Sequence, residues 1–138
     1  MHKHGRANQA RRELEGVSVV GKTKTATKAD RRRFIDLQMV GCIACRLEGL
    51  ADDANPESAD IHHIVMGGRR LGHQYTLPLC PWHHRGISVS GLPISQLEVL
   101  KGPSLARSKR AFVARYGTEL CLLERVNRHL ERLRRAVA

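Results

Sequence analysis

Four potential metal ligands in two matching pairs are the feature that most constrains how this chain folds. Two residues separate Cys42 from Cys45, and the same spacing recurs between Cys80 and His83. That spacing lets both members of a pair bind one ion, and three thiolates with one imidazole form a tetrahedral set typical of structural zinc. Such a site contributes folding free energy directly. We therefore expect zinc at these four residues; the alternative is a turn of buried thiols, with His83 unrelated to it.

The size of the chain makes a structural metal useful. With 138 residues, of which 4% are aromatic, the chain should form one small domain with an aliphatic core. No apolar run approaches the roughly 18 residues of a membrane span, and the N-terminus lacks the apolar segment of a secretory signal. We therefore expect a cytoplasmic protein with no membrane partner. In that compartment cysteines bind metals or stay reduced.

The charge is strongly basic and concentrated near the N-terminus. The formal net charge is +11, which favours a polyanion partner, most often nucleic acid. Residues 1–33 contain ten Lys and Arg against three Asp and Glu. We predict that residues 1–29 form a flexible basic arm that binds DNA and that residues 30–138 form the folded domain. A solubilising tail is the alternative. The candidate DNA ligands in the arm are Arg11, Arg12, Lys22 and Lys24.

The local patterns predict an α+β fold. A helix capped by Asp30 should run to Gly41, with its inward side formed by Phe34, Leu37 and Met39. A tight turn should hold Cys42 and Cys45. Residues 61–65 and 74–80 read as short strands joined by a Gly-rich turn, and Pro81 suits the first position of a following helix.

The C-terminal part of the chain should be helical. A short helix is expected over residues 94–100, and another should begin after Ser108 and end at Gly117. Thr118 should cap a last helix, on which Cys121 and His129 are expected to be structural or surface residues. The apolar stripe of that helix follows three-to-four spacing through Leu120, Leu123, Val126 (or Asn127), Leu130, Leu133 and Val137.

Five of the eight histidines lie between residues 60 and 84, in a pattern that suggests two metal centres. Alternation along a strand sends His62 and His63 to opposite faces, so one can bind a metal while the other stays available as a base. His83 can bind the structural zinc while its neighbour His84 reaches His62. The sequence also leaves open the exchange, in which His84 binds zinc and His83 is catalytic.

The order CIAC, IHHI and LCPWHH resembles the HNH (ββα-metal) nucleases. This resemblance implies a β-hairpin and a helix around one catalytic ion, Mg or another divalent metal. It implies His62 and His84 as ligands of that ion and His63 as the general base. The Cys pairs resemble the zinc knuckle of that family. The Asn that usually orients the base is missing here, and among His73, Gln74 and Tyr75 we favour His73 as its substitute.

A narrower resemblance covers about residues 40–130. The runs IHHIVMGGRRLGHQYTLPLCPWHHRG and GPSLARSKRAFVARYGTELCLLERVN are similar to the phage Ref family of RecA-dependent nucleases. This resemblance implies a phage- or prophage-encoded enzyme in a bacterial host, one that cuts DNA where a RecA filament has paired a strand. It also implies a basic N-terminal arm.

The predicted chemistry is therefore hydrolysis of a DNA phosphodiester, with zinc as a structural cofactor. Arg69 and Arg70 in the hairpin turn, and Arg85 after it, are candidate phosphate ligands, although a solvated turn would also contain them. Two other functions fit parts of the pattern. One is a non-catalytic zinc module that binds nucleic acid, and the other is an adaptor whose last helix docks on a partner protein.

Overall fold

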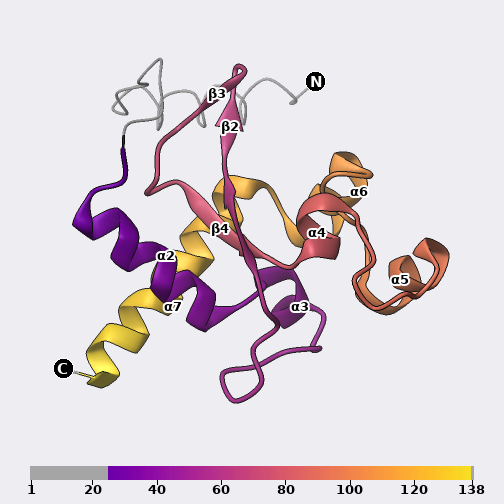
Figure 1. Ribbon diagram of the computed structural model, residues 1–138, viewed down its shortest axis with the longest axis horizontal. Coiled ribbons are helices and arrows are strands. Elements are labelled where there is room, and N and C mark those ends of the chain that lie inside the picture. The colour runs from indigo at the N-terminus through magenta and orange to yellow at the C-terminus, as the bar shows by residue number, and fades with distance from the viewer. Residues whose placement is uncertain (1–24, 138) are drawn as a thin grey trace, which may run out of the picture.

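Two antiparallel strands and a short helix form the centre of the molecule in the computed structural model, which describes residues 25–137 (Figure 1). Strand β1 (Asp60–His63) pairs with β4 (Thr76–Leu79), so that His62 lies opposite Leu77 and His63 opposite Thr76. Helix α4 (Pro81–Arg85) follows β4 after one residue and has its proline at the start of its first turn, as expected. The predicted α+β fold is confirmed.

A second, smaller strand pair extends from the first. Strands β2 (Val65–Met66) and β3 (Arg69–Arg70) pair across Gly67 and Gly68, whose φ angles are 59° and 74°. Two successive positive φ angles are what a two-residue hairpin turn requires. The segment predicted as a turn is therefore a short hairpin, which projects away from the helices in Figure 1 and exposes both arginines.

Helix α2 (Lys28–Val40) begins earlier than the sequence suggested. Thr27 is its N-cap, because the Thr27 hydroxyl accepts a hydrogen bond from the Asp30 amide and the Asp30 carboxylate accepts one from the Thr27 amide. Asp30 thus closes a reciprocal capping box from inside the helix and is not itself the cap. The helix ends at Gly41 as predicted. A Cβ there would lie 2.6 Å from the Glu57 carbonyl oxygen.

Helix α3 (Ile43–Leu47) occupies the segment predicted as a tight turn. The remaining helices are α5 (Ile94–Lys101), α6 (Lys109–Tyr116) and α7 (Glu119–Val137). Ser108 caps α6 and Gly117 ends it, as predicted. Thr118 caps α7, since its hydroxyl accepts a hydrogen bond from the Cys121 amide at 3.1 Å. The capping rules therefore located the later helix boundaries correctly.

The core lies where α2, α3 and α7 pack against β4. It is mainly aliphatic and includes Leu37, Val40, Ile64, Leu77, Leu79, Phe112, Leu122 and Val126. Two residues predicted to face inward are instead exposed, Met39 by 68% and Val137 by 87%. Met39 lies off the buried side of α2, which follows Arg33, Leu37 and Val40, and Val137 is the last residue of its helix. None of the helices described has both the length and the apolar character needed to cross a bilayer.

One buried cation joins α2, β4 and α7. Arg33 is only 5% exposed. Its guanidinium donates to the Thr76 hydroxyl at 2.9 Å, to the Thr76 carbonyl at 2.8 Å and to the Asn127 side chain at 2.9 Å. Because hydrogen bonds to charged groups are among the stronger ones, this contact stabilises the packing of both long helices on the strand.

Replacing Arg33 by Met should lower the free energy of unfolding by about 2 kcal/mol or more, because Thr76 and Asn127 would lose the hydrogen bonds that Arg33 donates. Urea unfolding measures the change. The matched control is Arg31→Met, an exposed arginine of the same helix, which should change stability by about 0.5 kcal/mol at most. Equal effects of the two substitutions would contradict the role given to Arg33.

Candidate functional site

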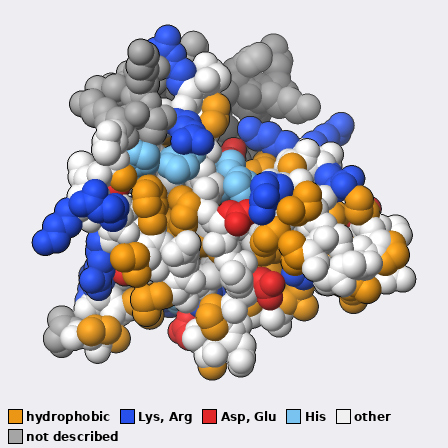
Figure 2. Space-filling view, in the orientation of Figure 1, with side chains coloured by type: hydrophobic (Ala, Val, Ile, Leu, Met, Phe, Trp, Pro, Cys, Tyr) orange, Lys and Arg blue, Asp and Glu red, His pale blue; other side chains and the backbone are white. Residues whose placement is uncertain are grey.

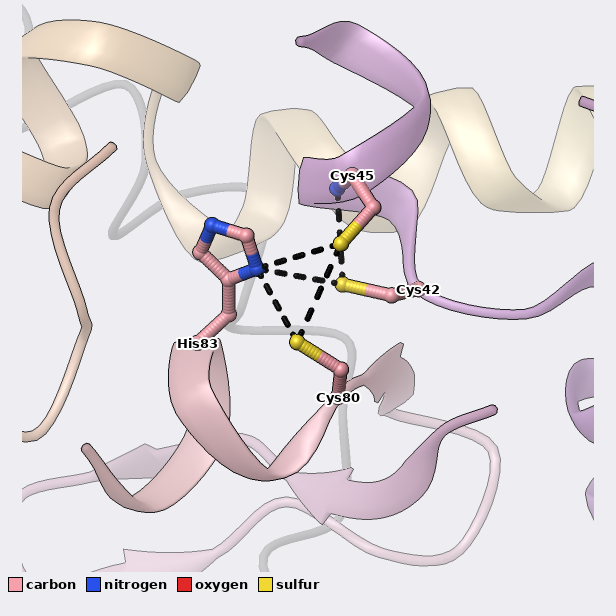
Figure 3. A group of neighbouring side chains, drawn as sticks. All are labelled: Cys42, Cys45, Cys80 and His83. Carbon is pink, nitrogen blue, oxygen red and sulfur yellow. Dashed lines mark hydrogen bonds between the residues drawn. The ribbon is translucent and has the colours of Figure 1, made fainter. Parts of the chain in front are cut away.

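Three cysteines and one histidine converge between two short helices (Figure 3). Cys42 caps α3 and Cys45 lies in its first turn, while Cys80 precedes α4 and His83 lies within it. All four side chains are buried, and their ligand atoms lie within 4.8 Å of one another. Helix α3 packs against β4, which leads directly into Cys80, and this packing brings the two halves together.

The distances suit a tetrahedral ion. His83 Nδ1 lies 3.4 Å from Cys42 Sγ, 3.6 Å from Cys45 Sγ and 3.2 Å from Cys80 Sγ, and the sulfurs of Cys45 and Cys80 are 3.8 Å apart. Ligands at ordinary zinc bond lengths stand about 3.8 Å apart for two sulfurs and about 3.5 Å apart for sulfur and nitrogen. The cluster therefore suits a structural zinc.

The thiols and the imidazole of the cluster shift one another's pKa. Hydrogen bonds with Cys42 and Cys80, together with burial, raise the pKa of Cys45, whereas hydrogen bonds from Cys42 and Cys45 lower the pKa of Cys80. Burial acts to lower the pKa of His83, but the neighbouring thiols outweigh it and raise that pKa to about 10. Three thiolates side by side repel one another, and a divalent metal would displace their protons and stabilise all three.

The ring nitrogen of His83 that faces away from the cysteines is hydrogen-bonded to a backbone carbonyl. His83 Nε2 lies 2.7 Å from the Lys101 carbonyl, to which it donates, and the Tyr116 hydroxyl is 3.3 Å from the same nitrogen. This bond leaves Nδ1 as the nitrogen that faces the thiols. His84 lies outside the cluster, with its Nδ1 3.2 Å from Asp60 Oδ2. The structure thus has His83, and not His84, beside the cysteines.

A second histidine group forms at the end of β1. The His62 and His84 rings approach edge to face, with centroids 5.0 Å apart. His62 Nε2 makes a close contact with the Glu119 carboxylate, and His84 Nδ1 faces that of Asp60. Figure 2 shows histidine side chains gathered on one face of the molecule, with Lys and Arg close to them.

The two carboxylates were missed by the sequence analysis. Asp60 is two residues before His62 on β1, a spacing that places both side chains on one strand face and could have identified it. Glu119 is the first residue of α7, and no local pattern connects it to His62. Burial acts to raise the pKa of Glu119, but its bond to His62 and the charges of His62 and Lys109 lower that pKa overall, so Glu119 is ionised.

His63 points away from this pair, as strand alternation predicted, and meets His73. His63 Nε2 and His73 Nδ1 are 3.0 Å apart, and the Phe34 ring packs edge-on against both imidazoles. Burial, and then the positive charge of Arg70, lower the pKa of His63 to about 4, so this imidazole is neutral at pH 7.

The candidate phosphate ligands divide into three groups. Arg69 and Arg70 are exposed on β3, and Arg70 is near enough to His63 to affect its pKa. Arg85 is engaged within the protein, since its Nε donates to Asp60 Oδ2 at 3.0 Å. The four residues predicted from the N-terminal arm lie outside the described residues: Arg11, Arg12, Lys22 and Lys24.

The HNH nuclease resemblance implies a strand pair followed by a helix, which bring histidines together beside a Cys3His cluster. The structure has this arrangement. A family model described as recombination enhancement, RecA-dependent nuclease matches residues 26–131. The chain therefore belongs to this family, which confirms the resemblance to the Ref proteins. It is a nuclease that acts in recombination, with DNA as its substrate and with the involvement of RecA.

Replacing Cys42 by Ser should remove tightly bound zinc and unfold most of the domain, because the cluster joins two segments of a small core. Metal content by mass spectrometry and circular dichroism measure the two effects. Cys121→Ser is the matched control, since Cys121 is exposed and separate from the cluster. The control should keep about one zinc per chain. A folded, zinc-replete Cys42→Ser protein would contradict this assignment.

Proposed function

We propose that this chain hydrolyses a DNA phosphodiester with His63 as general base and with a divalent ion bound at His62 and His84. The separation of the histidines supports this assignment. His63 is hydrogen-bonded to His73, while His62 faces His84 from the other face of the strand. His83 is engaged by the cysteines. Each histidine thus has surroundings that suit a different role.

The residues around His62 and His84 fit a divalent ion. Metal-binding histidines commonly use one ring nitrogen for the ion and the other for a carboxylate. Here Glu119 faces Nε2 of His62 and Asp60 faces Nδ1 of His84, which leaves His62 Nδ1 and His84 Nε2 for the metal. When bound, Mg or another divalent ion would bind a phosphate oxygen and stabilise the leaving 3′ oxygen. Two imidazoles also suit Mn, Zn or Ni.

His63 would accept the proton of the attacking water. A neutral imidazole is needed for that step, and the low pKa of His63 provides one at pH 7. His73 would orient the ring through its 3.0 Å bond to His63, in the role that Asn has in most HNH nucleases. Phe34, which packs against both rings, would limit their rotation.

Positively charged groups would bind the DNA around the site. Arg69 and Arg70 project on the hairpin, and Arg85 could leave Asp60 for a phosphate. The basic segment 1–29 would add contacts that depend on salt. We further propose that a RecA filament presents the DNA to be cut. Such a reaction would occur in the bacterial cytoplasm, the compartment that holds RecA and chromosomal DNA.

His63→Ala should reduce cleavage of RecA-paired DNA by about 10²- to 10⁴-fold, as expected for loss of a general base. Gel analysis of cleavage products measures the rate, and anisotropy with a labelled duplex measures binding. Binding and zinc content should stay at the wild-type level. Gln96→Ala, an exposed substitution on α5, is the control and should cut normally. A His63→Ala protein that cuts at the wild-type rate would remove His63 as the base.

Glu119→Gln should weaken binding of the catalytic ion by about 10- to 100-fold, because Glu119 holds the His62 ring that would bind it. Titration with Mn²⁺, followed by calorimetry on zinc-loaded protein, measures the affinity without reference to cleavage. Glu124→Gln, an exposed carboxylate of the same helix, should leave that affinity unchanged. Equal Mn²⁺ affinity in both variants would show that Glu119 has no part in metal binding.

A further inference from the structure

Four arginines of α7 form an exposed row, which we call the arginine stripe. Its members are Arg125, Arg128, Arg132 and Arg135. Steps of three, four and three residues keep them on one side of a helix. At 1.5 Å per residue the row is about 15 Å long, a length over which one DNA strand carries about four phosphates.

The charges of the stripe are not balanced inside the protein. Among residues 25–137, no carboxylate lies within ion-pair distance of any of the four guanidinium groups. Arg134 differs, because it points to another side of α7 and pairs with Asp36 at 3.5 Å. Arg132 donates to His129 Nδ1 at 3.0 Å, and His129 Nε2 lies 3.2 Å from Asp53. One member of the stripe is therefore held in place by a neutral acceptor.

The stripe borders a groove of about 570 Å³ between α7 and α3. On the other wall are Ile43 and Leu47, and a single carboxylate, Glu131, also lines the groove. A row of arginines beside a shallow apolar wall can bind phosphates through bidentate hydrogen bonds while the side-chain stems rest on the wall.

The stripe does not face the proposed cleavage site. By helix geometry the mean direction of the stripe is roughly 160° from that of Glu119, which contacts His62 from the buried side of α7. Leu122 and Val126, both fully buried, lie on that same inner side. The phosphates that the stripe can contact are therefore different from the phosphate next to His62.

We propose that the arginine stripe is a second DNA-binding surface, which holds the backbone of a DNA segment other than the one being cut. The family acts on DNA, and the evenly spaced arginines, which have no carboxylate partner among residues 25–137, are complementary to a phosphate backbone. An acidic protein surface is the other kind of partner that such a row could meet, and the experiment separates the two. That this segment differs from the one being cut rests on the proposed cleavage site at His62, whereas DNA binding by the stripe does not.

The test compares two triple variants that remove the same charge. The stripe variant is Arg125→Gln, Arg128→Gln and Arg135→Gln. The control is Arg31→Gln, Arg32→Gln and Arg134→Gln, exposed arginines outside the stripe. Both are built in the full chain that carries His63→Ala, and binding is measured without RecA and without added Mg, so that cleavage does not interfere whatever the role of His63. Zinc content and thermal unfolding verify that both variants are folded.

Anisotropy with a labelled duplex over a salt series gives the first result. The stripe variant should bind about tenfold or more weakly, and the slope of log affinity against log salt should fall by about 2 to 3 units, since each phosphate contact contributes about 0.9. The control should lose about twofold or less, because its arginines lie outside the proposed row of phosphate contacts. Equal losses in both variants would overturn the proposal, since they would reflect net charge alone.

Capture of a second duplex tests the remaining part. Protein bound to an immobilised duplex should retain a second, labelled duplex, and the stripe variant should not. The proposal that the stripe holds a second DNA segment is wrong if the stripe variant still bridges two duplexes. It is also wrong if the control triple variant never bridges them. The stripe variant is also tested with His63 intact. If it binds duplex DNA normally but loses RecA-dependent cutting, the stripe binds a protein partner. That result would overturn the proposal as well.

Discussion

The rest of the structure depends on the convergence of Cys42, Cys45, Cys80 and His83 between α3 and α4. These side chains join the segment before β1 to the segment after β4, at the end of the strand pair where Asp60 lies opposite Leu79. The hydrophobic core alone is small and mainly aliphatic. A metal bound there would stabilise the same strand-to-helix junction that carries the other histidines.

This junction explains how adjacent histidines acquire different surroundings. On β1 the pleat turns His62 toward α7 and His63 toward Phe34 and His73. On α4 the helical rotation turns His83 toward the thiols and His84 toward Asp60. Two pairs of neighbours therefore contribute to three groups: the Cys3His cluster, the His62–His84 pair and the His63–His73 pair. The proposed nuclease chemistry needs this division, because one ring cannot both bind a metal and accept a proton from water.

Helix α7 contributes to both candidate functional surfaces, the histidine site and the arginine stripe. Its first residue, Glu119, reaches the His62 side chain, and its inner side supplies Leu122 and Val126 to the core. Its outer side carries the arginine stripe. A single helix thus supports the candidate metal site, buries apolar surface and exposes a row of positive charge. The hairpin arginines lie on a different element, so basic groups occur on at least two separate surfaces.

The sequence by itself determined the features that depend on short spacing. The pairs at 42–45 and 80–83, the strand alternation at His62 and His63, and the caps Ser108 and Thr118 all depend on residues within a few positions of one another. The motif order was also sufficient to identify the family. Two predictions were wrong where a local pattern allowed two choices. The cap of α2 is Thr27 and not Asp30. Met39 is exposed because the helix is rotated differently from what the pattern suggested.

Only the tertiary structure decided which distant groups meet. The choice of His83 over His84 for the cysteine cluster depends on how α4 is rotated against α3, and the motif permitted both. Glu119 reaches His62 across 57 positions of sequence, and Arg33 reaches Thr76 and Asn127 only because α2 and α7 pack on the same strand. Such contacts follow from the packing of whole helices and strands, in which many weak interactions compete. A local sequence pattern therefore does not predict which distant residues meet.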